Sequence, residues 1–228
     1  MAKDTVFIVI AAYNEERAIP AVIKGLQKAG YTNIVAVDDG SKDHTAASIE
    51  AAGATLLKHS INRGQGAALK TGIDYALQQG ADAIVTFDAD GQHRTEDLPA
   101  MLKPILDSEV DVTLGSRFLK SGSNVPWLRR QLLQAGALLF KILYHVKLTD
   151  SHNGFRVLSR HAAETIQITS DRMEHASEII DQIGVHKLKY QEIPVIIRYT
   201  DYSIAHSSQG SFPALRIFLK TLAKKFLR

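Results

Sequence analysis

The decapeptide Ala83–Gln92, with the sequence AIVTFDADGQ, joins an apolar run directly to two aspartates. Residues Ala83–Phe87 are apolar and rich in β-branched side chains, which predicts a buried strand. The polar residues follow at its carboxyl end. Because ligands of an open parallel sheet bind outside the carboxyl ends of the strands, the decapeptide predicts both a strand and the edge of a binding site.

On either side of this decapeptide, short apolar runs alternate with helical patterns. Further strands are predicted at Val6–Ile10, Ile34–Val37, Thr55–Leu57 and Asp111–Leu114. Helices are predicted at Glu15–Ala29, Asp43–Ala52, Gly66–Gln79 and Thr95–Asp107. This alternation predicts an α/β fold with a doubly wound, mostly parallel sheet that carries helices on both faces.

The second half of the chain has a different pattern. An apolar and basic segment, Trp127–Leu148, precedes a turn at Ser151–Gly154 and a short strand. A helix near Glu174–Ile183, a strand at Tyr190–Tyr199 and an amphipathic helix at Phe212–Arg228 follow. We expect one domain over residues 1–210, with a nucleotide-binding half at about 1–118 and an acceptor-side half at about 119–210. Residues 211–228 are expected to form a separate basic helix.

The composition bounds the function. The 228 residues are 45% hydrophobic and 22% charged, which is typical of a globular domain. The absence of cysteine excludes disulfide scaffolds, cysteine-ligated zinc and thiol nucleophiles. A formal charge of +3 does not indicate a nucleic-acid partner. No run approaches the roughly 20 apolar residues that span a bilayer, and the N-terminus lacks a signal-peptide pattern, so a cytoplasmic location is expected.

The pair Asp88 and Asp90 carries the most specific chemical signal. Side chains two residues apart on extended backbone point the same way, so both carboxylates can face one pocket. Two unpaired carboxylates would raise each other's pKa, and a divalent cation removes that cost. Such a cation would act as a Lewis acid on a leaving diphosphate. The alternative is a solvated turn in which Asp90 caps a helix.

Two further polar clusters follow predicted strands. Asp38 and Asp39 can accept hydrogen bonds from a base or ribose, or can form a turn whose neighbours Ser41 and Asp43 cap the next helix. The segment Asn62–Thr71 contains Gly64-x-Gly66 but completes neither known phosphate-loop motif. Gly66 is therefore either part of a loop presenting amides to a diphosphate or a plain helix start.

Basic side chains are placed where a polyanion would bind. Arg117 follows the fifth predicted strand, Arg129 and Arg130 begin the apolar segment, and Arg198 ends a late strand. A lone surface arginine is usually solvated, but several near one predicted site favour phosphate binding.

Two segments have the character of membrane-surface helices. In residues 212–228, apolar side chains recur at helical spacing on one face and cations on another, with no acid among them. Residues 127–148 are also apolar and basic and begin with a tryptophan. Packing of the C-terminal helix on the core is the alternative. Two segments of the same kind favour peripheral association with the cytoplasmic face of a membrane.

Four motifs occur in an order that resembles family 2 glycosyltransferases. They are Ala12-Tyr13-Asn14-Glu15-Glu16, Val37-Asp38-Asp39-Gly40-Ser41, Asp88-Ala89-Asp90-Gly91-Gln92 and Gly115-Ser116-Arg117-Phe118. Asn153-Gly154-Phe155-Arg156 and Glu192-Ile193-Pro194-Val195 resemble, more narrowly, the dolichyl- or polyprenyl-phosphate sugar (mannose or glucose) synthases of that family. The resemblance covers roughly residues 5–200.

The resemblance implies a GT-A fold and an inverting hexosyltransferase that uses a UDP- or GDP-sugar with Mg²⁺ or Mn²⁺. It implies that Tyr13, Glu15, Asp38 and Asp39 bind the nucleoside, and that Asp88, Asp90 and Gln92 arrange the metal and diphosphate. Arg117, Arg129, Arg130 and Arg198 would bind phosphates, with Asp88, Asp90 and Arg117 as the catalytic set. Ala12, Gly66 and Ala89 complete the expected substrate-binding set.

The acceptor is implied to be a polyprenyl phosphate. The late Gly-x-Ser-Lys pattern of the lipid-phosphate synthases is missing here, which leaves a saccharide hydroxyl as an alternative acceptor. That acceptor would need a general base, for which Glu174, Glu178 and Asp181 are candidates. A non-catalytic nucleotide-sugar-binding scaffold is a third hypothesis. A separate small membrane protein that docks the C-terminal helix is a further hypothesis about partners.

Overall fold

A seven-stranded sheet forms the centre of the protein in the computed structural model, which describes residues 5–119, 146–150 and 153–197. In chain order the strands are β1 (Val6–Ala12), β2 (Ile34–Asp38), β3 (Thr55–Lys58), β4 (Ala83–Asp88), β5 (Val112–Ser116), β6 (Arg156–Ser159) and β7 (Tyr190–Pro194). Their order across the sheet is β3-β2-β1-β4-β6-β5-β7. Each predicted strand is present, and the prediction of an α/β, mostly parallel sheet is confirmed.

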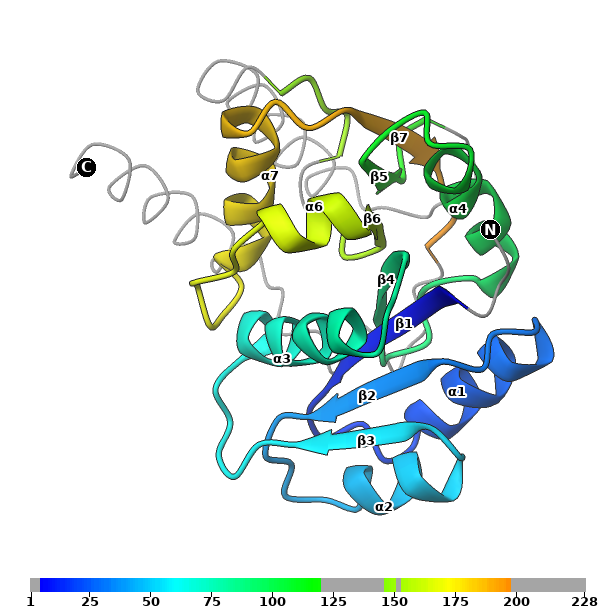
Figure 1. Ribbon diagram of the computed structural model, residues 1–228. Helices are drawn as coiled ribbons and strands as arrows, with labels where there is room; N and C mark the ends of the chain where they lie inside the picture. Colours follow the sequence, from blue (N-terminus) through cyan, green and yellow to red (C-terminus); the bar gives the residue numbers. More distant parts are fainter. Residues whose placement is uncertain (1–4, 120–145, 151–152, 198–228) are drawn as a thin grey trace.

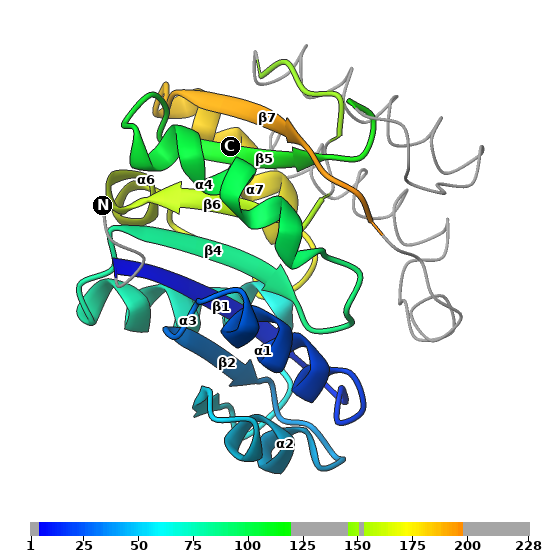
Figure 2. The ribbon, with the colours of Figure 1, turned by 90° about the vertical axis from the view of Figure 1, so that its right-hand side faces the viewer.

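Strand β6 is the exception to the parallel arrangement. It lies between β4 and β5 and runs antiparallel to both, as its reversed arrow in Figure 2 shows. Thr86 of β4 pairs with Arg156 of β6, so the residues that precede Arg156 lie beside the carboxyl end of β4. A strand from the second half of the chain thus adjoins the predicted carboxylate pair.

The helices cover both faces of the sheet (Figure 1). One face packs against α1 (Ile19–Lys28), α2 (Thr45–Ala51) and α4 (Leu98–Leu106). The other face packs against α3 (Gln65–Gln78), α6 (Arg160–Thr165) and α7 (His175–Val185). Alternation along β1 divides its side chains between the two cores, because Ile8 joins the first and Val9 the second. The predicted two-faced architecture is therefore confirmed.

Two helix boundaries differ from the expectation for physical reasons. Helix α1 begins at Ile19 rather than Glu15, because the backbone N–H groups of Glu15 and Glu16 donate to Thr45 Oγ1 and Asp43 Oδ2 in a neighbouring loop. The helix expected at 95–107 is divided into a 3₁₀ turn, η2 (Thr95–Asp97), and α4, which has Pro99 in its first turn. Proline is favoured at that position because its missing N–H would have no helical partner.

Several expectations fall on residues outside the described ranges. They include the helix at 211–228, most of the segment 127–148, the boundary near residue 210, and Arg129, Arg130 and Arg198. Within residues 5–119, 146–150 and 153–197, no helix combines the length and apolar character needed to cross a bilayer.

Candidate active site

The carboxyl ends of β1, β2 and β4 meet at one edge of the sheet. Ala12 of β1 is in register with Asp38 of β2, and Ala11 is in register with Asp88 of β4. The Asp39 N–H also donates to the Ala12 carbonyl oxygen at 2.8 Å. Three of the polar clusters singled out in the sequence therefore lie side by side at the position where such sheets bind ligands.

Asp88 ends β4 and is held by three contacts with two neighbours, His93 and Gln65. The His93 Nδ1 atom accepts the Asp88 N–H at 3.2 Å, so its Nε2 carries the proton and donates to Asp88 Oδ2 at 3.1 Å. Gln65 donates to Oδ1 at 3.3 Å. Burial alone would raise the pKa of Asp88, but the attraction and hydrogen bond of His93 outweigh it and lower the pKa. The carboxylate stays ionised, and its side chain remains 30% exposed.

His93 is itself fixed by aromatic packing. Its ring is buried and stacks on Phe155, the residue immediately before β6, with ring centroids 5.0 Å apart. The edge of Phe87 closes another side at 5.1 Å. His93 belongs to the polar cluster that follows the predicted strand, three residues beyond Asp90, but nothing in the sequence indicated its role.

Asp90 is in the opposite electrostatic state. Its Oδ1 accepts the N–H of Gln92 at 3.0 Å. Burial and the negative charge of Asp88 raise the pKa of Asp90 to about 6. The expectation that the two carboxylates raise each other's pKa is thus met for Asp90 and wrong for Asp88, whose pKa is lowered through its contact with His93.

The donor set fits a divalent cation that also takes oxygen from a substrate. In the described part of the chain, no three His, Cys, Asp or Glu side chains come together as a complete metal cage. Mg²⁺ is usually bound through one or two carboxylates, with substrate phosphates and water as the other ligands. Asp88 and Asp90 supply that number of carboxylates, whereas a structural metal site would require more.

A buried cation lies behind Asp88. Arg156 is 3% exposed; its Nε donates to the Asn153 carbonyl and its Nη2 to the Ala176 carbonyl. Burial lowers the pKa of Arg156 to about 10, against the attraction of Asp88 and Asp150, and the group remains charged. An arginine inside a predicted short strand was the available signal for this residue, but its burial could not be read from the sequence.

His175, at the start of α7, is the neutral member of this buried group. Burial and the positive charge of Arg156 lower the pKa of His175 to about 4. Because its Nδ1 lies 2.8 Å from the Arg172 carbonyl oxygen, that nitrogen carries the proton and donates.

His175 is expected to destabilise the fold in acid. Its folded-state pKa lies below the ordinary 6.5, so the stability it contributes is complete above pH 6.5 and is lost as the pH falls towards 4. Between pH 7 and 4 the loss amounts to about 3 kcal/mol relative to His175→Gln, which does not titrate. Urea unfolding of both proteins across this range measures the difference. If both proteins lost stability in parallel as the pH falls, the lowered pKa of His175 would be contradicted. The charges of Arg156, Asp88 and Glu178 around the ring are present in both proteins, so they do not account for a difference between them.

The loops after β1 and β2 form one hydrogen-bonded unit. Asn14 donates its N–H to Ser41 Oγ, and its Oδ1 accepts the N–H of Lys42. The Glu16 carboxylate accepts the N–H of His44. Asn14 adopts a positive φ of 55°, which asparagine tolerates better than most residues. This bracing leaves the side chain of Tyr13 42% exposed at the edge of the site.

Asp38 and Asp39 are both buried, and each carboxylate accepts hydrogen bonds from backbone N–H groups. Asp38 Oδ1 accepts the Ser41 N–H, as a turn-forming aspartate does. The Asp39 carboxylate accepts the N–H groups of Arg63 and Gly64 and lies 2.7 Å from His59 Nδ1. Asp39 therefore attaches the 59–64 loop to the end of β2. Contact of Asp38 and Asp39 with a nucleoside stays a prediction.

Gly64 and Gly66 are required for close packing. A Cβ on Gly66 would lie 2.0 Å from the Ser170 carbonyl oxygen, and one on Gly64 2.5 Å from that of Asp171. The Asp171 carbonyl also accepts the N–H of Ala67 in the first turn of α3. The 170–171 turn thus lies against the start of this helix. Delivery of amides from Gly66 to a diphosphate stays a prediction.

Arg117 lies at the end of β5 and is buried. Its guanidinium forms a fork on Asp150, with Nε–Oδ2 at 2.6 Å and Nη2–Oδ1 at 2.7 Å. Glu178, a candidate general base, has its carboxylate on the backbone N–H groups of Thr169 and Ser170. Arg117 thus connects the end of β5 to residue 150, and Glu178 connects α7 to residues 169 and 170. The sequence did not predict these structural contacts.

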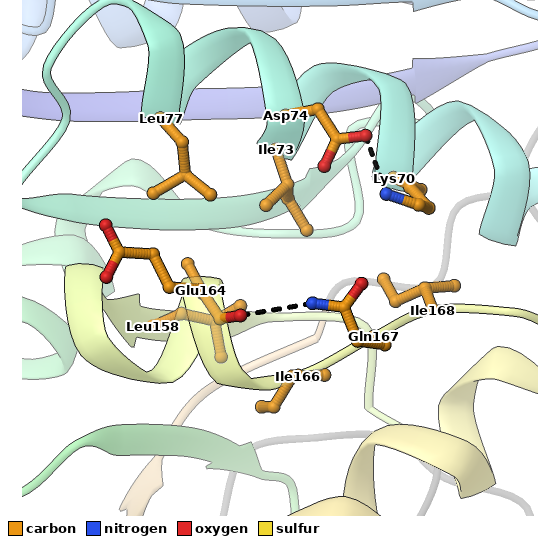
Figure 3. A pocket seen from close by; sticks show the side chains of 10 residues that line it. Lys70, Ile73, Asp74, Leu77, Leu158, Glu164, Ile166, Gln167 and Ile168 are labelled. Carbon is orange, nitrogen blue, oxygen red and sulfur yellow. Dashed lines mark hydrogen bonds and ion pairs between the residues drawn. The ribbon is translucent and has the colours of Figure 1, made fainter.

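A cavity of about 230 Å³ lies apart from this edge, between α3 and the α6 region (Figure 3). Its walls are mainly apolar, with Ile73 and Leu77 on one side and Ile166 and Ile168 on the other. None of the carboxylates of the sheet edge lines it.

Comparison with known proteins gives a consistent result. Residues 7–167 match the family described as Glycosyl transferase family 2. The UDP-N-acetylglucosamine–dolichyl-phosphate N-acetylglucosaminyltransferase of Methanococcus voltae is 32% identical over 99% of this chain and 98% of its own length. The polyprenol monophosphomannose synthase of Mycolicibacterium smegmatis is 30% identical over 72% of this chain and 64% of its own. Among solved structures, glucosyl-3-phosphoglycerate synthase from Mycobacterium tuberculosis, crystallised with Mn²⁺ and UDP-glucose, has a TM-score of 0.72 at 19% identity, covering 96% of this chain and 77% of its own.

Proposed function

Since the chain belongs to glycosyl transferase family 2, we propose that it transfers a hexose from a nucleotide sugar to a polyprenyl phosphate at a membrane surface. The observation that carries the proposal is the pair Asp88 and Asp90 at the carboxyl end of β4, beside the braced loops of β1 and β2. Names of relatives with lipid-phosphate acceptors support the choice of acceptor.

The donor is bound along the sheet edge. The exposed ring of Tyr13 and the loops held by Asp38 and Asp39 would bind the nucleoside, with Glu15 close by. Asp88, Asp90 and Gln92 would hold Mg²⁺ or Mn²⁺ with the diphosphate. When bound, the cation supplies the positive charge that stabilises the leaving nucleoside diphosphate. The Mn²⁺ in the solved glucosyl-3-phosphoglycerate synthase supports a divalent ion.

The acceptor step needs little help from the protein. An oxygen of the acceptor phosphate attacks the anomeric carbon as the bond to the diphosphate breaks, which inverts the configuration. A phosphate is ionised near neutral pH, so it requires no strong general base. Glu178, a candidate general base, already accepts hydrogen bonds from the backbone N–H groups of Thr169 and Ser170, which is consistent with this. Arg129, Arg130 and Arg198 are proposed as phosphate ligands from their positions in the sequence.

Membrane association is proposed through residues 127–148 and 212–228, with a small separate membrane protein as a further partner. The relatives act, by name, on dolichyl or polyprenyl substrates, which reside in membranes. The basic amphipathic pattern supports the surface location.

Transfer of label from a nucleotide sugar into a lipid-extractable product tests the function. Purified protein is incubated with Mn²⁺, polyprenyl phosphate and radiolabelled UDP- or GDP-hexoses, and the organic phase is counted. We expect label only when both the phosphate lipid and the metal are present. The matched control is the polyprenol without phosphate, which should accept nothing. Label that appears in a soluble saccharide instead would contradict the lipid acceptor.

A further inference from the structure

We propose that Arg117 is a positioning residue that acts through Asp150: the pair clamps the chain at the end of β5 and thereby sets Gly154 against the Asp88 carboxylate. The proposal concerns a residue of the site described above, and its activity readout rests on the proposed function. It replaces the expectation that Arg117 is a phosphate ligand.

The clamp is built around a buried fork. Arg117 Nε and Nη2 contact the two Asp150 oxygens at 2.6 and 2.7 Å, and the Arg117 N–H donates to Oδ2 at 3.1 Å. The side chains are 5% and 0% exposed. A bidentate pair fixes distance and plane together, so the fork defines where residue 150 lies relative to β5.

A second layer of hydrogen bonds comes from strands β5 and β7. The hydroxyls of Ser116 and Thr149 lie 2.6 Å apart. The Glu192 carboxylate accepts the N–H of Thr149 at 2.9 Å and that of Asp150 at 3.1 Å. Ser116 of β5, Glu192 of β7 and Arg117, the residue after β5, therefore hold residues 149 and 150 at one point. The parts of the chain on both sides of residues 120–145 are joined there.

The clamp continues into the contact with Asp88. Asn153, three residues after Asp150, accepts the Phe155 N–H through its Oδ1, and the Gly115 N–H donates to the Phe155 carbonyl at 2.9 Å. On the other side, Thr86 Oγ1 donates to the Gly154 carbonyl at 2.6 Å. Between these supports, a Cβ on Gly154 would lie 2.9 and 3.0 Å from the two Asp88 oxygens. The backbone of Gly154 is thus in contact with the carboxylate that it positions.

The same geometry argues against direct phosphate binding by Arg117. Two of its guanidinium nitrogens are directed at Asp150, whose charge offsets its own. The residue is 6% exposed, so a polyanion would have to displace a buried carboxylate to reach it.

Hydrogen exchange on the substrate-free protein tests the clamp independently of any activity. Arg117→Gln and Asp150→Asn are expected to accelerate exchange in residues 153–156 while β2 keeps its protection. Arg160→Gln, which breaks an exposed arginine–glutamate pair, is the matched control and should leave both regions unchanged. Unchanged exchange at 153–156 in both clamp variants would overturn the proposal, whatever the acceptor is.

Kinetics distinguish positioning from ligand binding. If Arg117 acts through Asp150, each single variant lowers kcat about 100-fold, the double variant is no worse, and the donor KM stays within about threefold. Arg117→Lys should be as impaired as Arg117→Gln, since lysine cannot form the fork. A raised donor or acceptor KM, rescue by lysine, or a fully active Asp150→Asn would instead establish a phosphate ligand.

A milder variant covers the case in which breaking the fork prevents folding. Ser116→Ala removes the hydroxyl that contacts Thr149 Oγ1 and accepts the Phe118 N–H, and it leaves no buried charge unpaired. We expect about a fivefold lower kcat, unchanged donor KM and slightly faster exchange at 153–156. Wild-type values for kcat and exchange in this variant would count against the clamp.

Discussion

Asp90→Ala is expected to lower kcat by about a thousandfold or more, because in the proposed function a metal-held diphosphate is the largest charge that the site must stabilise. The variant should fold normally. Asp90 is a partly buried carboxylate whose pKa is raised to about 6 by burial and by Asp88, so its removal relieves a repulsion. Thermal unfolding is therefore expected at the wild-type temperature or slightly above it.

Two measurements check this expectation together. Mn²⁺ titration in the presence of the nucleoside diphosphate should show weakened metal binding, and the transfer assay should show the loss in kcat. Asp107→Ala is the matched control, since Asp107 forms only a helix-surface pair with Lys103. Activity within tenfold of wild type at saturating Mn²⁺ would remove the basis of the metal assignment.

Gly154→Ala should cost about 100-fold in kcat through the addition of a single methyl group. The new Cβ would lie 2.9 and 3.0 Å from the two oxygens of Asp88, closer than ordinary contact allows. Either the carboxylate rotates away from its hydrogen bond with His93, or the backbone at 154 shifts from Thr86. In the first case the oxygens that are proposed to bind the metal leave their places, and in the second Asp88 loses the backbone against which it rests.

The matched control for this variant is Gly25→Ala in α1. Its Cβ would meet only a methyl group of Thr95 at 3.8 Å, and alanine favours a helix, so activity and stability should be retained or slightly improved. A crystal structure of Gly154→Ala should show a displaced Asp88 side chain. Wild-type activity with Asp88 unmoved would mean that the contact has no role in the site.

Much of the fold could be predicted from the sequence because its signals are local. A run such as Ala83–Phe87 has the composition of a buried strand wherever it occurs, and the alternation with helices restricts the sheet to a parallel, two-faced arrangement. The position of Asp88 and Asp90 at a carboxyl end follows from the same local pattern. The structure confirms that β4 ends at Asp88.

The antiparallel insertion of β6 could not be predicted in the same way. Strand pairing between residues 83–88 and 156–159 depends on contacts between segments about 70 residues apart, and the four-residue strand has no pattern that specifies a neighbour. This pairing places Gly154 and Phe155, the two residues before β6, against β4. The surroundings of His93 and Arg156 therefore depend on it.

The sequence by itself determined which residues carry charge and that they follow strand ends. Only the tertiary structure decided what each charge faces. Asp88 has a lowered pKa and Asp90 a raised one although they are two residues apart, because His93 hydrogen-bonds to Asp88, whereas burial and the charge of Asp88 dominate at Asp90. Likewise, Arg117 forms a buried fork with a carboxylate 33 residues away. Electrostatic environments fall off over a few ångströms of space, and such distances are fixed only when the chain has folded.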